Sequence, residues 1–235
     1  MARRVRQLDL DLREAPRWGG RRAGAGRKCG PSPRHSHRAR APLAARFPCH
    51  VTLRVRRGLP SLRTRRLVAE LRRRFAPACE RGRFRLVHYS LQRDHLHLIV
   101  EAASARDLAN GMKAVAARFA HGVNRVLAHS GAVLADRYHL RILRTPREVR
   151  SALAYVLLNA RKHWRQRFGV APPVRLDEAS SGRWFDGWRT PPPPGGRVPP
   201  GGQRAGPEVA PPRTWLLAAG WRRHGLIDPT EVPGI

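Results

Sequence analysis

Two histidines with strand spacing are the first residues that could do chemistry. The motif His95-Leu96-His97 lies within residues 84–102, a stretch rich in Leu, Ile and Val. Because side chains alternate between the two faces of a strand, both imidazoles point one way while Leu96 points into a core. Two imidazoles on one face supply half of a metal site. A pair of edge-strand histidines without a ligand is the alternative interpretation.

Tyr155 and Asn159 are the second candidate set, four residues apart in a predicted helix. Positions i and i+4 share a helix face, and both side chains lie off the apolar stripe of that helix. The Asn159 amide could be a third ligand, and a divalent cation with three neutral ligands keeps its charge to polarise a phosphate. Tyr155 could then be a nucleophile, because a phenol with a pKa near ~10 needs such help. An ordinary surface tyrosine is the alternative, and Tyr138 is a rival nucleophile.

The elements that must position these residues follow one another along residues 46–168. Hydrophobic periodicity predicts strands over residues 50–56, 83–91, 95–102 and 133–143, and helices over 61–80, 103–128 and from 146 onward. The last helix has a capping box in Thr145-Pro146-Arg147-Glu148. Its predicted apolar stripe is Val149, Leu153, Val156, Ala160 and Trp164.

The order of these elements predicts an α+β fold. The first six spell the ferredoxin-like split βαβ pattern, with four antiparallel strands and helices on one face, and the final helix carries Tyr155. In this topology the first and third strands are neighbours at the sheet centre. We expect the face that carries the histidines to be polar, basic and open to a ligand. The first strand would contribute His50, Thr52, Arg54 and Arg56 to it.

The charge of the chain indicates a nucleic-acid partner. The 235 residues carry 47 basic and 16 acidic side chains, a formal net charge of +31. Such an excess repels itself unless it meets a polyanion, and arginine forks bind phosphate and stack on bases. A GC-rich genome that favours arginine codons would explain the arginines differently, but it leaves the charge unchanged.

Composition divides the chain into four parts. Residues 1–45, rich in Arg, Gly and Pro, are predicted to be a basic arm that is disordered when free. Residues 46–168 form the predicted catalytic domain, and residues 169–212, with four consecutive prolines, are predicted to be an extended linker. Residues 213–235 form a short helix and tail. This helix is expected to dock through Trp215, Leu216 and Trp221.

Cysteine usage and the start of the sequence bear on the compartment. Cys29, Cys49 and Cys79 form no CxxC pair, so neither a zinc knuckle nor a disulfide framework is predicted. The charged first residues lack the apolar stretch of a signal peptide, and no apolar run approaches the ~20 residues of a membrane span. We expect a cytoplasmic, nucleoid-associated protein.

Three stretches together resemble the HUH single-tyrosine transposases. They are HYSLQRDHLHLIVEA, DRYHLRIL and YVLLNARKH, and with the HVTLR strand they look closest to the REP-associated tyrosine transposases, relatives of the small insertion-sequence transposases. The resemblance covers about residues 46–165. It implies that His95 and His97 are the HUH histidines, that Asn159 replaces the third, amide ligand, and that Tyr155 is the nucleophile.

The resemblance also implies a reaction. The family cleaves single-stranded DNA beside imperfect palindromic hairpins with Mg²⁺ or Mn²⁺, leaving a 5′-phosphotyrosine and a free 3′-OH, so that rejoining needs no ATP. Two positions depart from the family pattern, Ala160 and Arg93-Asp94, where many relatives have proline and Pro-Asn. Neither departure removes a reacting group. On this basis DNA contacts are expected from His50, Thr52, Arg54, Arg56, Arg137, Arg141, Arg161 and Lys162.

Two other functions fit parts of the sequence. A chain of this fold, as monomer or homodimer, could hold hairpin DNA or repress its own gene without turnover. His50-Val51-Thr52-Leu53 also matches half of the paired HxT/S signature of the 2H phosphoesterases. The second half would have to be His95-Leu96-His97, which has histidine where serine or threonine belongs.

Overall fold

The computed structural model describes residues 42–190 and 207–234. The predicted basic arm lies outside the described residues except for positions 42–45, and residues 191–206 of the predicted linker lie outside them too. No helix among the described residues has the length and apolar character that crossing a membrane requires.

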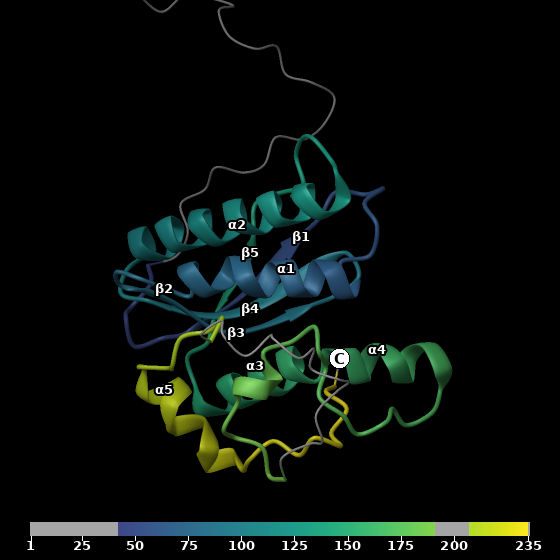
Figure 1. Ribbon diagram of the computed structural model, residues 1–235. Helices are drawn as coiled ribbons and strands as arrows, with labels where there is room; N and C mark the ends of the chain where they lie inside the picture. Colours follow the sequence, from purple (N-terminus) through teal and green to yellow (C-terminus); the bar gives the residue numbers. More distant parts are fainter. Residues whose placement is uncertain (1–41, 191–206, 235) are drawn as a thin grey trace, which may run out of the picture. The chain divides into compact units, whose positions relative to one another are not determined.

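An antiparallel sheet of five strands forms the middle layer of the fold (Figure 1). The strands lie in the order β2-β3-β4-β1-β5, so that β1 and β4 are neighbours, as the sequence predicts. The predicted α+β split βαβ fold is therefore confirmed, with the two-residue strand β2 added at one edge. The strands are β1 (Cys49–Arg54), β2 (Glu80–Arg81), β3 (Phe84–Leu91), β4 (His95–Ala102) and β5 (His139–Ile142).

The last strand, β5, is shorter than predicted. The sequence predicts a strand over residues 133–143, but only the four residues of β5 pair along β1. Leu134 adds an isolated bridge to Val55. Between these two contacts the Asp136 carboxylate accepts a hydrogen bond from the backbone N–H of Arg137, a local contact that competes with strand pairing.

Helices α1 (Arg65–Phe75) and α2 (Ala105–Leu127) cover one face of the sheet (Figure 1). Helix α1 is shorter than the predicted 61–80, because Thr64 caps its first turn and Pro77 lies in a 3₁₀ turn, η1 (Ala76–Ala78), that ends it. Helix α2 matches its predicted range. The core between these helices and the sheet includes Leu71, Phe75, Leu98, Met112 and Phe119.

A glycine allows α2 to approach the sheet. A Cβ atom at Gly111 would lie 2.0 Å from a ring carbon of Phe84 on β3, so no larger residue fits without displacing that ring. The helix and the strand are therefore held in close contact at this point.

The other face of the sheet is also covered, which corrects the prediction that it is open to a ligand. Helices α3 (Pro146–Leu157) and α5 (Trp215–Ala218) lie on it (Figure 1). Ile99 follows the two histidines on this face of β4, and Val87, at the register shift in β3, packs in the same apolar cluster. This half of the face is therefore apolar and buries a helix. Residues of the cluster from the helices include Val149, Leu153, Val156, Leu216 and Leu217.

The predicted final helix is in fact two helices. The capping box at its start is confirmed, but the helix ends at Leu157 and a second helix, α4 (Asn159–Phe168), begins after Leu158, whose φ is −108° and ψ 12°. Helix α4 buries only Asn159 and Arg161, so little apolar surface holds it on the sheet. Trp164, predicted to lie in the apolar stripe, is 37% exposed.

The C-terminal segments pack back onto the domain. Residues 176–189 and 207–212, which belong to the predicted linker, hydrogen-bond to the sheet: Ser181 N–H donates to the Tyr89 carbonyl and Ala210 N–H to the Leu86 carbonyl. The buried Glu208 carboxylate accepts hydrogen bonds from Tyr89 Oη at 2.9 Å and from the indole of Trp184 at 2.8 Å. The described parts of the linker therefore pack against the domain.

The C-terminal helix docks with two of its three predicted anchors. Leu216 and Trp221 are buried, in α5 and in the 3₁₀ segment η4 (Gly220–His224). Trp215 is 53% exposed, with the Arg223 guanidinium 4.9 Å from its ring centre.

His88 makes the stability of the fold depend on pH. Its imidazole is buried, with Nδ1 3.2 Å from Ser181 Oγ, and burial lowers its pKa from 6.5 to about 4. Between these values the unfolded chain binds a proton on His88 that the folded chain does not bind. The free energy of unfolding contributed by this group is therefore complete above pH 6.5 and falls as the pH falls toward about 4.

We predict that His88 costs the fold about 1.4 kcal/mol of unfolding free energy per pH unit between about pH 6 and pH 4.5, measured by urea denaturation. H88N, which keeps a polar atom near Ser181 but does not titrate, should reduce the pH slope by about one proton. H121Q, which removes a histidine from the exposed surface of α2, should leave the slope as it is. An H88N slope equal to that of the wild type would contradict the assignment.

Candidate active site

Strands β1 and β4 bring three imidazoles and one hydroxyl together. Thr52 and His97 are cross-strand partners, so their side chains leave the same face of the sheet side by side. His97 Nδ1 lies 3.1 Å from Thr52 Oγ1 and 3.1 Å from His50 Nε2. On the other side of the same ring, His97 Nε2 lies 3.0 Å from His95 Nε2. The motif spacing therefore produces the clustering that the sequence predicts.

The Asp94 carboxylate sets the tautomer of His95, and the Thr52 hydroxyl can set that of His97. The Asp94 carboxylate is 2.7 Å from His95 Nδ1, so Nδ1 carries a proton and Nε2 of neutral His95 has a lone pair. When His97 Nδ1–H donates to Thr52 Oγ1, Nε2 of His97 has a lone pair too. Two lone pairs then face the same point. An outer ring of a carboxylate and a hydroxyl that orients two imidazoles is typical of metal sites.

Burial keeps two of the imidazoles neutral. It lowers the pKa of His97 to about 2, helped by the neighbouring His50 and His95, and His97 is only 4% exposed. It also lowers the pKa of His50 to about 4, with Arg141 and His139 acting in the same direction. Since a histidine must be deprotonated to bind a cation, His97 is ready to do so at neutral pH.

Helix α3 places Tyr155 against these imidazoles. Its half-buried ring lies 5.1 Å from that of His97 and 5.8 Å from that of His50, both in edge-on arrangements. Lys162 of α4 sits with its Nζ 5.1 Å from the centre of the Tyr155 ring. The predicted nucleophile and the predicted ligand His97 are therefore in contact.

The other two tyrosines of the chain pack in or against the hydrophobic core. Tyr89 is buried and its hydroxyl donates to Glu208 Oε1 at 2.9 Å. Tyr138, the rival nucleophile, packs partly buried against the core under α1 and α2. Neither arrangement resembles that of Tyr155, which lies on the histidine-bearing face.

Asn159 is the first residue of α4 and is fully buried. Neither its Oδ1 nor its Nδ2 has a hydrogen-bond partner in the structure. An unpaired buried amide costs about 1–3 kcal/mol, so these atoms are free to bind something that is not part of the chain. The helix break before Asn159 means that Tyr155 and Asn159 do not share one straight helix face, contrary to the prediction.

The strand spacing brings the imidazoles of His95 and His97 together, and the Asn159 amide at the start of α4 has the chemistry that a third ligand would need. Among residues 42–190 and 207–234 there is no group of three or more His, Cys, Asp or Glu side chains that could hold a metal ion. A cation at His95 and His97 would therefore need a ligand of another type, and Asn159 has an oxygen without a partner.

The residues predicted to contact DNA lie in different surroundings. Arg54, Arg56, Arg137 and Arg141 are exposed, and Arg141 pairs with Glu148 at 3.3 Å. His50 and Thr52 point their polar atoms at His97, which makes them its partners rather than surface contacts. This arrangement also differs from the paired HxT/S signature, because the facing strand offers a second imidazole and no hydroxyl.

The prediction that Arg161 contacts DNA is wrong, because its side chain is buried. It is only 7% exposed, and its guanidinium donates to the backbone carbonyls of Pro173, Thr230 and Glu231 at 2.8, 3.1 and 3.2 Å. These bonds tie α4 to the C-terminal tail. Arg161 therefore stabilises the packing of α4 against the segments that carry these carbonyls, and its guanidinium is not available to a phosphate.

Sequence analysis missed two residues beside the site. Asp94 orients His95, and its position directly before the motif was the signal that could have identified it. His163 of α4 lies with its ring 6.4 Å from that of His95. Its proximity depends on the direction that α4 takes after the break at Leu158, so no local pattern could have revealed it.

The comparisons with known proteins add a structural likeness. No protein-family model and no curated protein matches the sequence. Among solved structures, the chain is similar to a REP-associated tyrosine transposase bound to a REP hairpin, with 17% identity and a TM-score of 0.44. The alignment covers 55% of this chain and 74% of that chain. This likeness is a distant one, at the level of the fold.

Variants of the neighbouring residues Arg161 and Lys162 should differ in their effect on the free energy of unfolding. We predict that R161Q lowers the free energy of unfolding by about 2 kcal/mol or more, because three carbonyls lose a charged donor. K162Q should change it by no more than about 0.5 kcal/mol. Thermal or urea denaturation of both variants checks this. An R161Q protein as stable as K162Q would show that the contacts to the tail contribute nothing.

Proposed function

We propose that this chain is a metal-dependent single-stranded DNA endonuclease and strand-transferase, acting at hairpin-flanked sites through a 5′-phosphotyrosine. The observation that carries the proposal is the position of Tyr155, whose ring lies 5.1 Å from His97 while Nε2 of His97 converges with that of His95 at 3.0 Å. A phenol beside a pair of imidazoles that could hold a metal ion is an arrangement that suits phosphoryl transfer to tyrosine. The net charge of +31 suits a nucleic-acid substrate.

In this proposal His95, His97 and Asn159 would hold a divalent cation, Mg²⁺ or Mn²⁺. When bound, such a cation supplies positive charge that polarises a phosphate oxygen. The chain supports this role through the orientation of its ligands: Asp94 holds the ring of His95, and Thr52 holds the ring of His97.

The side chains around the site would carry out the transfer. The Tyr155 hydroxyl loses its proton and its oxygen attacks phosphorus, the bond from phosphorus to the 3′ oxygen breaks, and that oxygen takes up a proton to become the free 3′-OH. The 5′ phosphate stays on the enzyme as a tyrosine ester. The Lys162 ammonium, 5.1 Å from the Tyr155 ring, lies where it can bind the same phosphate. The ester retains the energy of the broken bond, so a free 3′-OH can reverse the step and join the strand.

A second function is favoured by the burial of the site. His97 is only 4% exposed and Tyr155 is half-buried beneath α4 residue Lys162. A protein with the same fold could bind hairpin DNA, or repress its own gene, without ever admitting a phosphate to the imidazoles. Cleavage of a labelled oligonucleotide in the presence of Mn²⁺ separates the two functions.

Y155F should abolish the covalent DNA adduct and leave hairpin binding nearly intact, because it removes only the attacking oxygen. The substrate is single-stranded DNA from the regions that flank the protein's own gene, incubated with Mn²⁺ and resolved on a denaturing gel. Y138F is the matched control and should form the adduct like the wild type. Adduct formation by Y155F, or its loss in Y138F, would rule out the assigned nucleophile.

Thr52→Val should weaken the response to metal without affecting hairpin binding. Loss of the hydroxyl removes one contact of His97 Nδ1 and leaves its contact with His50 Nε2, and such outer contacts are worth about 10–100-fold in metal affinity. The Mn²⁺ concentration for half-maximal cleavage should therefore rise by a factor of about 10–100. T52S keeps the hydroxyl and should behave like the wild type. Equal Mn²⁺ dependence in T52V and T52S would mean that the hydroxyl does not orient a ligand.

A further inference from the structure

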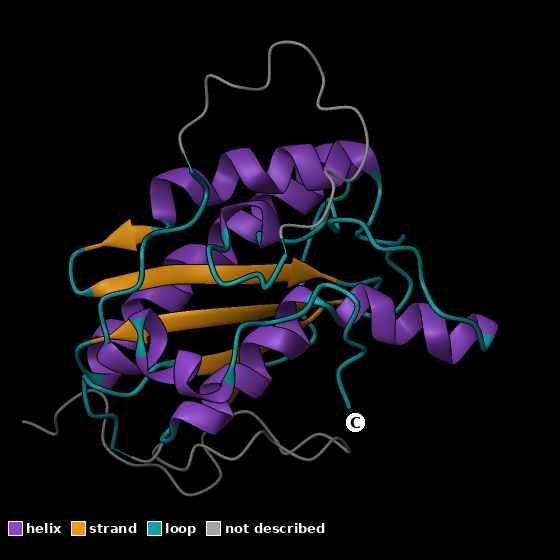
Figure 2. Cartoon of the chain, turned by 90° about the horizontal axis from the view of Figure 1, so that it is seen from below, coloured by secondary structure: helices purple, strands orange, loops and turns teal. Residues whose placement is uncertain are grey.

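Helix α4 leaves the domain with two aromatic side chains uncovered. Figures 1 and 2 show it extending away from the sheet beyond the end of α3, and residues 163–171 are exposed throughout. Trp164 is 37% exposed and Phe168 51% exposed. Their ring centres are 4.6 Å apart because they stand four residues apart on one helix face. Together they form a small aromatic surface, called here the α4 platform.

The surroundings of the α4 platform are strongly basic. Residues 159–168 contain four Arg or Lys side chains and one His, and no acidic residue. The Arg167 guanidinium lies 5.2 Å from the centre of the Phe168 ring. Exposed aromatic faces among arginines are the combination that binds single-stranded nucleic acid, because bases stack on the rings while the cations contact the phosphates. A second copy of the chain is a poorer occupant, since two such helices would bring like charges together.

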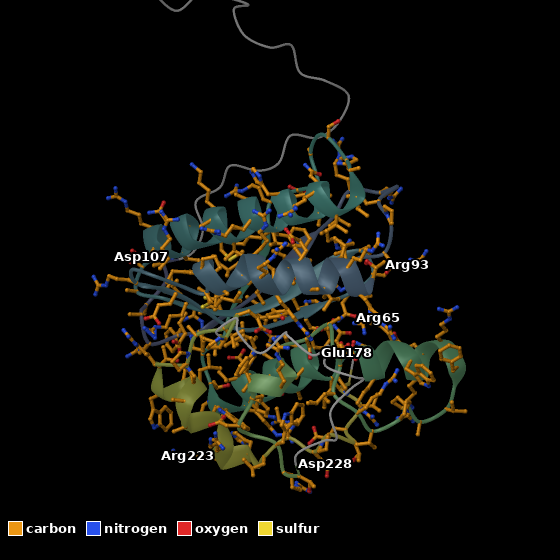
Figure 3. The ribbon with its side chains drawn as sticks, in the orientation of Figure 1. Arg65, Arg93, Asp107, Glu178, Arg223 and Asp228 are labelled. Atoms are coloured by element: carbon orange, nitrogen blue, oxygen red, sulfur yellow. The ribbon has the colours of Figure 1, made fainter. Side chains whose placement is uncertain are left out.

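The α4 platform is continuous with the candidate active site. The first two turns of α4 carry Lys162, which lies over the Tyr155 ring, and His163, whose ring lies 6.4 Å from that of His95. Trp164 and Phe168 follow on the same short helix. Figure 3 shows Arg65 and Arg93, both exposed, on the side of the domain where α4 lies. A strand whose phosphate reaches Tyr155 would therefore meet α4 next.

We propose that the α4 platform binds unpaired bases of the DNA strand that leads to the cleavage site, stacking them on Trp164 and Phe168. This deepens the proposed function and rests on it for the identity of the substrate. The platform supplies affinity for the single-stranded flank of a hairpin, while the imidazoles and Tyr155 act on its phosphate.

The test compares two fluorescein-labelled DNA hairpins by anisotropy in the absence of metal. Both carry a single-stranded extension of about eight nucleotides, made with the extension at either end. In one form the extension contains thymines and in the other it is abasic, with the same phosphates. The Y155F protein should bind the thymine form at least about tenfold more tightly, because even one stacked base contributes about that factor.

Adding W164A and F168A to Y155F should remove this discrimination, so that both hairpins bind with the affinity of the abasic form. W164L and F168L, which keep apolar bulk and lose the aromatic face, should give the same result and cover the case in which the alanine protein does not fold. V170A and V174A change exposed apolar residues that follow α4 and should leave the discrimination intact.

Discrimination that survives the loss of both rings would overturn the proposal. So would a wild-type dimer in sedimentation that the leucine or alanine variants convert to a monomer with unchanged base discrimination, since the rings would then serve self-association. Failure to bind any hairpin would remove the proposed function itself, whereas equal binding of both hairpins by Y155F would remove only the platform.

Discussion

The pairing register of β1 and β4 is the constraint on which the candidate site depends. Thr52 stands opposite His97, and the imidazoles of His50 and His95 reach the same ring from either side only in this register. A shift of either strand by one residue would turn the side chains of that strand to the other face of the sheet. Burial of Val51, Leu53, Leu96 and Leu98 beneath α1 and α2 opposes such a shift, because the shifted strand would lose its apolar contacts with these helices.

The histidine-bearing face is divided into a polar half and an apolar half, and the division explains how Tyr155 comes to lie beside the imidazoles. Ile99 and Val87 form a patch on which α3 buries its apolar residues. A helix held there ends near the imidazoles, so Tyr155 is delivered to them by packing several residues away. The chemistry of this face and its hydrophobic contacts are thus parts of one arrangement, and an entirely polar face could not have anchored α3.

Local patterns were sufficient for the sheet and for much of the site. Apolar runs on either side of the turn at Gln92-Arg93-Asp94 gave the bounds of β3 and β4 almost to the residue, and the His95 and His97 pair, Tyr155 and its capped helix followed from spacing. The break at Leu158 was not predictable, because apolar residues continue at helical intervals through it and no proline or glycine marks it. The tail was misjudged for a related reason. Glu208 is buried by Tyr89, more than a hundred residues earlier in the sequence, and no local signal reports such a contact.

The departures from local rules gather in one part of the chain, and this concentration is itself informative. Residues 158–168 contain a helix break without proline, a buried amide without partners, and two exposed aromatic rings. Each is unfavourable for an isolated chain: the amide alone costs about 1–3 kcal/mol. Natural sequences are otherwise consistent at every level, so unfavourable features that adjoin a cluster of neutral imidazoles are best explained by groups that are satisfied only when a ligand is bound. In the proposed function a cation would satisfy the amide and a base would satisfy the rings, so that one short helix would contact a bound strand at two points.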